Sequence, residues 1–213
     1  LRTREFKKCT LRMSYRITQP IADFVNKAML GEERLLACKD GCQVTYIRRA
    51  HHQASAIIIN QILKLFESGV TASDIFVLAH SVKKIDSDIR KIENTLAERN
   101  IPCFVPMSEI EKMDDRVIDG KVVFTTFNSV KGRQRKYVFV VGFDQSYFNW
   151  IARDLPKDIC PNTLYVACTR STEGLTVIEK GDRAEDHPLS FLKMTHHDMM
   201  NSSFVDFKGI PRS

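Results

Sequence analysis

The chain has 213 residues, of which 43% are hydrophobic and 27% are charged, a balance typical of a folded, soluble domain and unlike that of a disordered or fibrous protein. Lysine and arginine exceed aspartate and glutamate by 32 to 26, which gives a formal net charge of +6 and favours polyanionic partners through counterion release. No apolar run approaches the roughly 18 residues that a membrane-spanning helix requires, so we expect a soluble protein.

The cysteines are dispersed along the chain, and no secretory signal precedes them. This pattern predicts a reduced, intracellular protein, cytoplasmic or nuclear and not secreted. Cys38 and Cys42, with His51 and His52 nearby, are the only candidate zinc ligands. The two cysteines flank a Lys-Asp-Gly turn and no second pair follows at zinc-finger spacing, so we expect no metal site in the chain.

The first half of the chain alternates extended and helical patterns, with Pro20 in the first turn of one helix and Gly31 at its end. The expected elements, in chain order, are an extended segment at 10–13, a helix from 18 to 31, a strand at 44–47, a helix at 51–66, a strand at 75–79, a helix at 85–99, extended structure at 101–105 and a polar surface connection at 106–120.

The second half contains two very apolar strands, 122–127 and 137–141, then a short helix at 162–172 and a final strand at 175–178. This alternation predicts an α/β domain with a mostly parallel sheet and helices on both faces. Ligands of such sheets gather at the carboxyl ends of the strands. We expect the domain to span 1–194 and a loose, polar tail to span 195–213. The basic opening at Leu1 predicts an excised part of a longer polypeptide.

Tyr15 and Arg16 follow the first expected strand directly. An aromatic ring here can stack on a nucleobase, while the planar guanidinium can fork onto phosphate oxygens. Alternatively, Tyr15 packs in the core and Arg16 forms a surface ion pair.

A second polar segment follows the strand that ends in Thr125-Thr126 and contains Asn128 and Lys131-Gly132. Glycine allows backbone amides to approach a phosphodiester, and threonine and asparagine side chains can bond phosphate or sugar without reading sequence. Taken alone, the Lys-Gly pair is equally well an ordinary turn.

A third segment, Leu-Tyr-Val-Ala-Cys-Thr-Arg, ends at Arg170 just before the last expected strand. An arginine in this position can reach the nucleotide site of a neighbouring domain and neutralise charge on a transferring phosphoryl group.

In this order the three segments resemble motifs IV, V and VI of superfamily 1 helicases of the UvrD/Rep type, across most of residues 10 to 180. The resemblance implies a second RecA-like motor domain of the P-loop NTPase type, in which Tyr15 stacks on adenine and Arg16 and Arg170 reach the γ-phosphate. It also implies that Gln134 lies near the ribose. Single-stranded DNA, or RNA, would then run along the residues that match motif V: Thr126, Asn128, Lys131 and Gly132.

The chain departs from the family pattern at two places. Asn128 stands where the family has histidine, and Arg133-Gln134 stand where it has Leu-Glu. The interval between the first two motifs is also short for the family, so we expect the accessory domain that larger members insert there to be absent or minimal.

The sequence contains no Gly-x4-Gly-Lys-Ser/Thr loop, and Asp144 has no second acid beside it. We therefore expect ATP and Mg²⁺ to be held mainly by a first RecA-like domain of the same polypeptide, and this part alone to hydrolyse ATP negligibly. Two other functions stay open: a module that binds nucleic acid or a partner protein through the basic loop 131–136, and a stand-alone nucleotide-dependent enzyme.

Overall fold

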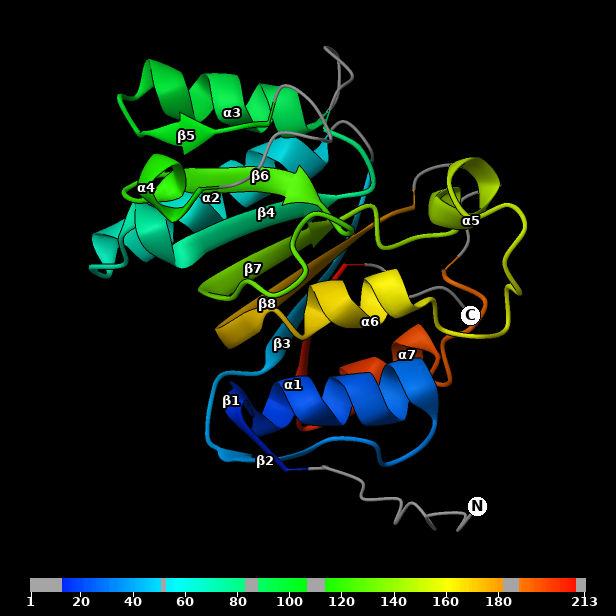
Figure 1. The fold of residues 1–213 in the computed structure, drawn as a ribbon. Coiled ribbons are helices and arrows are strands. Elements are labelled where there is room, and N and C mark those ends of the chain that lie inside the picture. Colours follow the sequence, from blue (N-terminus) through cyan, green and yellow to red (C-terminus); the bar gives the residue numbers. More distant parts are fainter. Residues whose placement is uncertain (1–12, 51–52, 83–87, 107–113, 182–187, 210–213) are drawn as a thin grey trace, which may run out of the picture.

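The computed structural model describes residues 13–50, 53–82, 88–106, 114–181 and 188–209. Within them, seven strands form one sheet in which every pairing is parallel, so the α/β class and the parallel sheet are confirmed (Figure 1). In spatial order the strands are β5 (Cys103–Phe104), β6 (Val122–Thr126), β4 (Ile75–Ala79), β7 (Arg135–Val141), β8 (Ser171–Lys180), β3 (Val44–Arg49) and β9 (Val205–Lys208).

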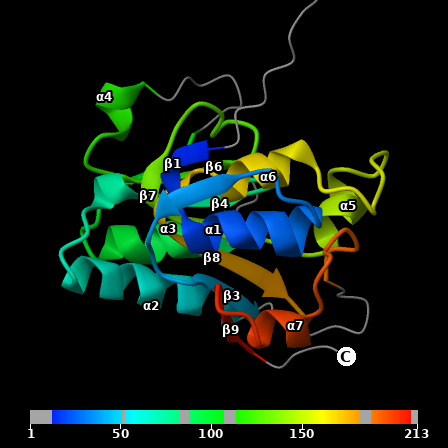
Figure 2. The same cartoon turned by 90° about the horizontal axis from the view of Figure 1, so that it is seen from below.

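Helices cover both faces of the sheet, as the apolar strands require. Figure 2 shows β8 between α1 and α6 on one side and α2 on the other. One face carries α1 (Gln19–Asp23), its π-helical continuation η1 (Phe24–Leu30), α5 (Ser146–Trp150), α6 (Asn162–Cys168) and α7 (His196–Met200). The other carries α2 (Ala54–Glu67) and α3 (Asp88–Glu98), while two short turns, η3 (Ala72–Asp74) and α4 (Asp115–Ile118), connect elements.

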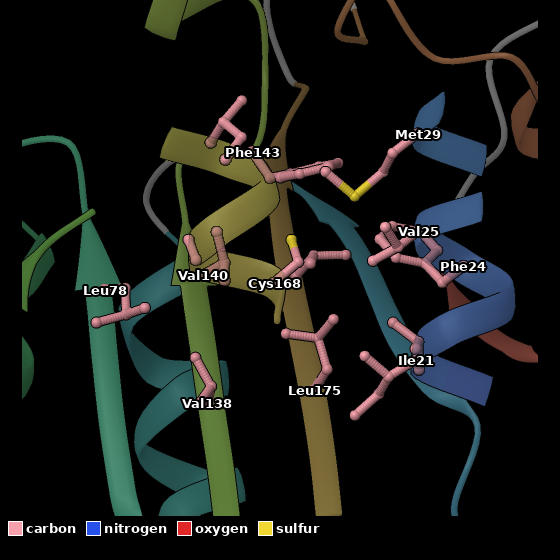
Figure 3. Packing of buried hydrophobic residues seen from close by; sticks show 14 of the residues in the cluster. Ile21, Phe24, Val25, Met29, Leu78, Val138, Val140, Phe143, Cys168 and Leu175 are labelled. Atoms are coloured by element: carbon pink, nitrogen blue, oxygen red, sulfur yellow. The ribbon is translucent and has the colours of Figure 1, made fainter. Parts of the chain in front are cut away.

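Side chains of one strand alternate between two cores. Val138 and Val140 of β7 face η1 and α6, whereas Phe139 and Val141 face α2 and α3. Figure 3 shows Val138 and Val140 in the first of these cores, which Ile21 enters from α1. Each fully buried aliphatic side chain stabilises the fold by about 1.5 to 3 kcal/mol, so the two cores together hold the strand ends where they are.

A second, two-stranded parallel sheet lies beside the start of β8. It pairs β1 (Met13–Thr18) with β2 (Leu36–Lys39). The first helix ends at Gly31, whose φ of +70° is the left-handed conformation that glycine adopts without strain. The buried Asn26 then fixes the return of the chain, because its amide donates to the Leu35 carbonyl at 2.6 Å. Lys39 on β2 donates to the Thr172 carbonyl on β8 at 2.8 Å.

The expected loose tail is wrong for residues 195–209. Thr195 caps α7 reciprocally with Asp198, and β9 pairs with β3 as an edge strand of the main sheet. Phe204 and Val205 are buried against the core. The strand that we expected to be last, β8, is therefore followed by another.

Several expectations fall partly outside the described residues, which omit 10–12, 51–52, 85–87 and 107–113. Where the chain is described, none of its helices combines the length and the apolar character needed to cross a membrane.

Candidate functional site

Arg170 lies between the end of α6 and the first residue of β8, as predicted. Its Nε donates to the Val166 carbonyl at 3.0 Å, and one terminal nitrogen contacts the Thr169 hydroxyl at 3.2 Å. A cation at this end of a helix is favourable, since the last carbonyls there have no helical partner. The side chain is half-buried, so the backbone of α6 sets the direction of the guanidinium.

Arg16 lies near Arg170, although the two are distant along the chain. Burial lowers the pKa of Arg170, and repulsion from the Arg16 charge lowers it further. Tyr15 and Arg16 lie within β1, not after it as expected. Tyr15 is 77% exposed, which argues against the alternative that its ring packs in the core.

Neither Arg16 nor Arg170 has a carboxylate within ion-pair distance among the described residues. Two neighbouring cations that lack a counter-charge repel each other, and a bound anion would relieve that repulsion. Arginine forks suit the oxygen atoms of phosphate groups. This edge of the domain therefore has the chemistry of a phosphate-binding surface.

Gln134 lies beside Arg170, because the strands that follow them, β7 and β8, are paired. The Arg135 amide donates to the Arg170 carbonyl at 3.1 Å, and Arg135 pairs with Ser171 in the sheet. Gln134 also lines an open cavity of about 540 Å³, whose wall includes Ser73, Asp115, Asp119 and Gly132. The backbone of Gln134 is thus fixed between the Arg16 and Arg170 pair and this cavity.

The candidate residues divide between the amino ends and the carboxyl ends of the parallel strands, which we call the amino edge and the carboxyl edge of the sheet. This corrects the expectation that they gather at the carboxyl ends. Arg170 and Gln134 precede β8 and β7, so they lie at the amino ends. Thr126 is the last residue of β6 and lies at the carboxyl end. Because β6 and β7 are both parallel to β4, residues 127–134 must cross from one edge to the other (Figure 1).

A tight turn begins that crossing. The Thr126 hydroxyl lies 2.9 Å from the Ser129 hydroxyl and accepts from the Ser129 amide at 3.2 Å, while Asn128 is exposed. Gly132 has a φ of +80°, and a Cβ there would meet nothing within 4 Å. Left-handed geometry therefore requires this glycine, and the space in front of its backbone is open.

The basic loop 131–136 offers fewer available charges than its sequence suggests. Arg133 pairs with Asp115, and Lys136 pairs with Asp74 at 3.2 Å. Arg135 is used inside the fold, where its terminal nitrogens reach four backbone carbonyls: Ala72 at 2.9 Å, Ile75 at 3.0 Å, Lys121 at 2.5 Å and Ile118 at 3.0 Å. Within the described part of the chain, Lys131 is the cation of this loop whose side chain forms neither an ion pair nor a hydrogen bond.

Arg135→Ala should lower the free energy of unfolding by about 2 to 4 kcal/mol, because it strands buried carbonyls. The guanidinium also lies 4.7 Å from the centre of the Phe76 ring, and burial lowers the pKa of Arg135 to about 10. Denaturant unfolding measures the loss. The exposed Arg116→Ala is the matched control, and equal stabilities of the two variants would contradict the structural role of Arg135.

Asp144, which imitates a magnesium-binding strand end in the sequence, is buried and bonded within the fold. Its carboxylate accepts from the Ser146 amide at 3.0 Å and from the Lys180 amide at 3.2 Å. Burial raises the pKa of Asp144, and these bonds oppose the rise. Across the residues that the structure describes, no group of three or more metal-ligating side chains comes together, and His51 and His52 lie outside them.

Sequence reasoning missed Arg34 and Lys39, which the β1–β2 unit brings to the same edge. Tyr165 on α6 lies in the field of both Arg34 and Arg170: burial raises the pKa of Tyr165, and these two charges lower it. Arg34 pairs with Glu32 at 2.7 Å on the surface. The pairing of β1 with β2 places Lys39, and the bond from the Arg34 amide to the Asn26 side chain at 3.0 Å places Arg34, so no linear motif could identify them.

The same fold occurs in a solved protein. The chain matches the crystal structure of the C-terminal domain of a possible DNA helicase from Lactobacillus plantarum, with a TM-score of 0.58 and 16% sequence identity. The match covers 92% of this chain and 99% of that domain. No family model and no curated protein sequence matches the chain. The chain thus has the RecA-like α/β fold seen in that helicase domain.

Proposed function

We propose that the chain is the second motor domain of an ATP-dependent DNA helicase or translocase of the UvrD/Rep type. One observation carries the proposal: Arg16 on β1 and Arg170 just before β8 come from distant segments but are neighbouring cations, because β1 packs beside β8, and neither has a carboxylate partner among the described residues. The fold shared with the C-terminal domain of a possible DNA helicase supports it.

In this proposal the amino edge of the sheet faces a nucleotide held mainly by a first RecA-like domain with its Mg²⁺. The γ-phosphate, whose transfer to water releases the energy, would lie against Arg16 and Arg170. Their guanidinium groups would neutralise the charge that develops on its oxygens. Tyr15 is exposed and free to stack on the adenine, and Gln134 would donate to or accept from the ribose hydroxyls.

The carboxyl edge and the connection that leaves it would hold single-stranded DNA, with RNA as the other candidate. Thr126 and Asn128 lie at this edge, while Lys131 and Gly132 lie further along the connection, with Gly132 in the wall of the cavity that Gln134 also lines. An exposed asparagine, an exposed lysine and an open glycine suit contacts to a sugar-phosphate backbone. Residues 127–134 connect this edge to Gln134 and Arg170. Closure of two domains around ATP and their reopening after hydrolysis would therefore move the strand contacts and the arginine pair together.

The rival binding module differs in its response to nucleotide. In the full-length polypeptide, we expect the affinity for an oligothymidylate to change when a non-hydrolysable ATP analogue is added, and the oligonucleotide to stimulate hydrolysis. The 213-residue chain alone should show no magnesium-dependent turnover above the background of a Lys131/Arg170 double alanine variant. Fluorescence anisotropy measures the affinity for the oligonucleotide, and phosphate release measures the ATP turnover. An affinity indifferent to the analogue, without hydrolysis, would favour the binding module.

A further inference from the structure

The carboxyl edge carries an exposed aromatic side chain that none of the three motifs includes. Trp150 is the last residue of α5 and is 67% exposed. The Arg153 guanidinium lies 5.7 Å from the centre of its ring, and Arg153 Nε donates to the Asn149 carbonyl at 2.8 Å. An indole rarely stays this exposed, because it has a large apolar area to bury.

The helix beneath Trp150 is firmly anchored. Tyr147 and Phe148 are buried, the Tyr147 hydroxyl lies 2.6 Å from that of Thr163 on α6, and Phe148 packs on Phe191 with ring centres 6.2 Å apart. A side chain on such a base loses little further freedom when it binds a partner.

Contacts between aromatic rings join α5 to the start of the proposed strand track. Phe127, between Thr126 and Asn128, packs on Tyr147 with ring centres 6.1 Å apart. α5 follows the carboxyl end of β7, as Asn128 follows that of β6. Figure 1 shows α5 beyond the arrowheads of these strands. Trp150 is therefore on the same edge as the proposed contacts to the sugar-phosphate backbone.

We infer that Trp150, backed by Arg153, is a stacking platform for a base of the single strand, beyond the contacts made by Asn128. This inference rests on the proposed function. The Arg153 guanidinium lies over the indole ring and Trp150 is mostly exposed, an arrangement that suits stacking with any base. The charges of the following segment balance, since Asp154 and Asp158 accompany Arg153 and Lys157. Stacking here should thus depend little on salt.

A partner protein is the other candidate for binding at Trp150, because the same segment exposes three aliphatic residues: Ile151, Leu155 and Ile159. The arginine on the indole and the shared edge with Asn128 favour the nucleic acid. A protein interface would instead depend on the aliphatic residues at least as much as on the ring.

Trp150 is the one tryptophan in the chain, so its intrinsic fluorescence reports on this position alone. An oligothymidylate of about 15 nucleotides, labelled at one end, allows anisotropy to measure binding independently of the indole. We expect the oligonucleotide to quench the tryptophan emission. Trp150→Ala should weaken binding roughly 5- to 150-fold at every salt concentration, and Trp150→Phe should retain most of the affinity. Leu155→Ala, the matched control, should bind as the parent does.

A contrasting variant separates stacking from charge. Lys131→Ala should reduce the slope of log affinity against log salt by about 1, whereas Trp150→Ala should leave the slope unchanged. Normal binding without quenching, together with unchanged affinity of Trp150→Ala, would overturn the platform while leaving the proposed function intact. If the unsubstituted chain binds no oligonucleotide, the proposed strand track fails first. Self-association that Trp150→Ala and Leu155→Ala both abolish, with oligonucleotide affinity unchanged, would assign the surface to protein.

Discussion

Arg170→Ala in the full-length polypeptide is expected to reduce nucleic-acid-stimulated ATP turnover by about 10³- to 10⁵-fold, the scale of an arginine that stabilises phosphoryl transfer from a neighbouring domain. The guanidinium would act on charge that develops in the transition state, so kcat should fall far more than KM rises. Steady-state phosphate release with saturating oligonucleotide measures both constants.

Two variants make the Arg170 result specific. Arg170→Lys keeps the positive charge but loses the planar fork and the bond from Nε to the Val166 carbonyl, so it should recover only a small part of the turnover. Arg116→Ala removes an exposed arginine from α4 and should leave turnover unchanged. Because Arg170 also bonds the end of α6, unfolding of each variant must be compared with that of the parent. Undiminished turnover of a folded Arg170→Ala would remove this residue from the ATP site.

The largest expected effect on stability comes from Glu179→Ala, which should lower the free energy of unfolding by about 3 to 5 kcal/mol, the usual cost of breaking a buried ion pair. Glu179 is fully buried. Its carboxylate accepts from the Tyr46 hydroxyl at 2.5 Å and from Arg48 Nε at 3.1 Å, and it lies 2.7 Å from His196 Nε2. Removing it leaves a nearly buried arginine without this carboxylate and detaches α7 from β8.

Chemical denaturation monitored by circular dichroism tests the role of Glu179. Asp206→Ala is the matched control, because Asp206 forms an exposed ion pair with Lys208 at 2.9 Å on the edge strand β9, and this pair should contribute about 1 kcal/mol or less. If the two substitutions had equal effects, the buried network would not hold the C-terminal segment in place.

The same network shows why the end of the chain was mispredicted. Residues 195–209 are mostly polar, and the strand pattern of β9 extends over only four residues. What fixes this segment is its contact with distant residues: Phe207 stacks on Tyr46 with ring centres 5.3 Å apart, and His196 reaches Glu179. By contrast, the boundaries of β4 were predicted correctly, because it is a fully buried apolar run.

The candidate site was only partly predictable for a related reason. The position of Arg170 before a buried strand is a local property and could be anticipated. Strand order and register bring Arg16 close to Arg170 and divide the polar residues between the two edges. Neither can be seen in the linear sequence. Likewise, Arg135 looked like a surface charge of a basic loop, and only the carbonyls gathered around it make it a structural residue.

In the proposed motor, Arg16 and Arg170 together bind the terminal phosphate of a nucleotide. A structure of the full-length polypeptide with single-stranded DNA and a non-hydrolysable ATP analogue tests it most directly. We predict both guanidinium groups at hydrogen-bond distance, about 2.7 to 3.2 Å, from the oxygens of the γ-phosphate. A nucleotide bound elsewhere, with both arginines turned to solvent, would contradict the claim.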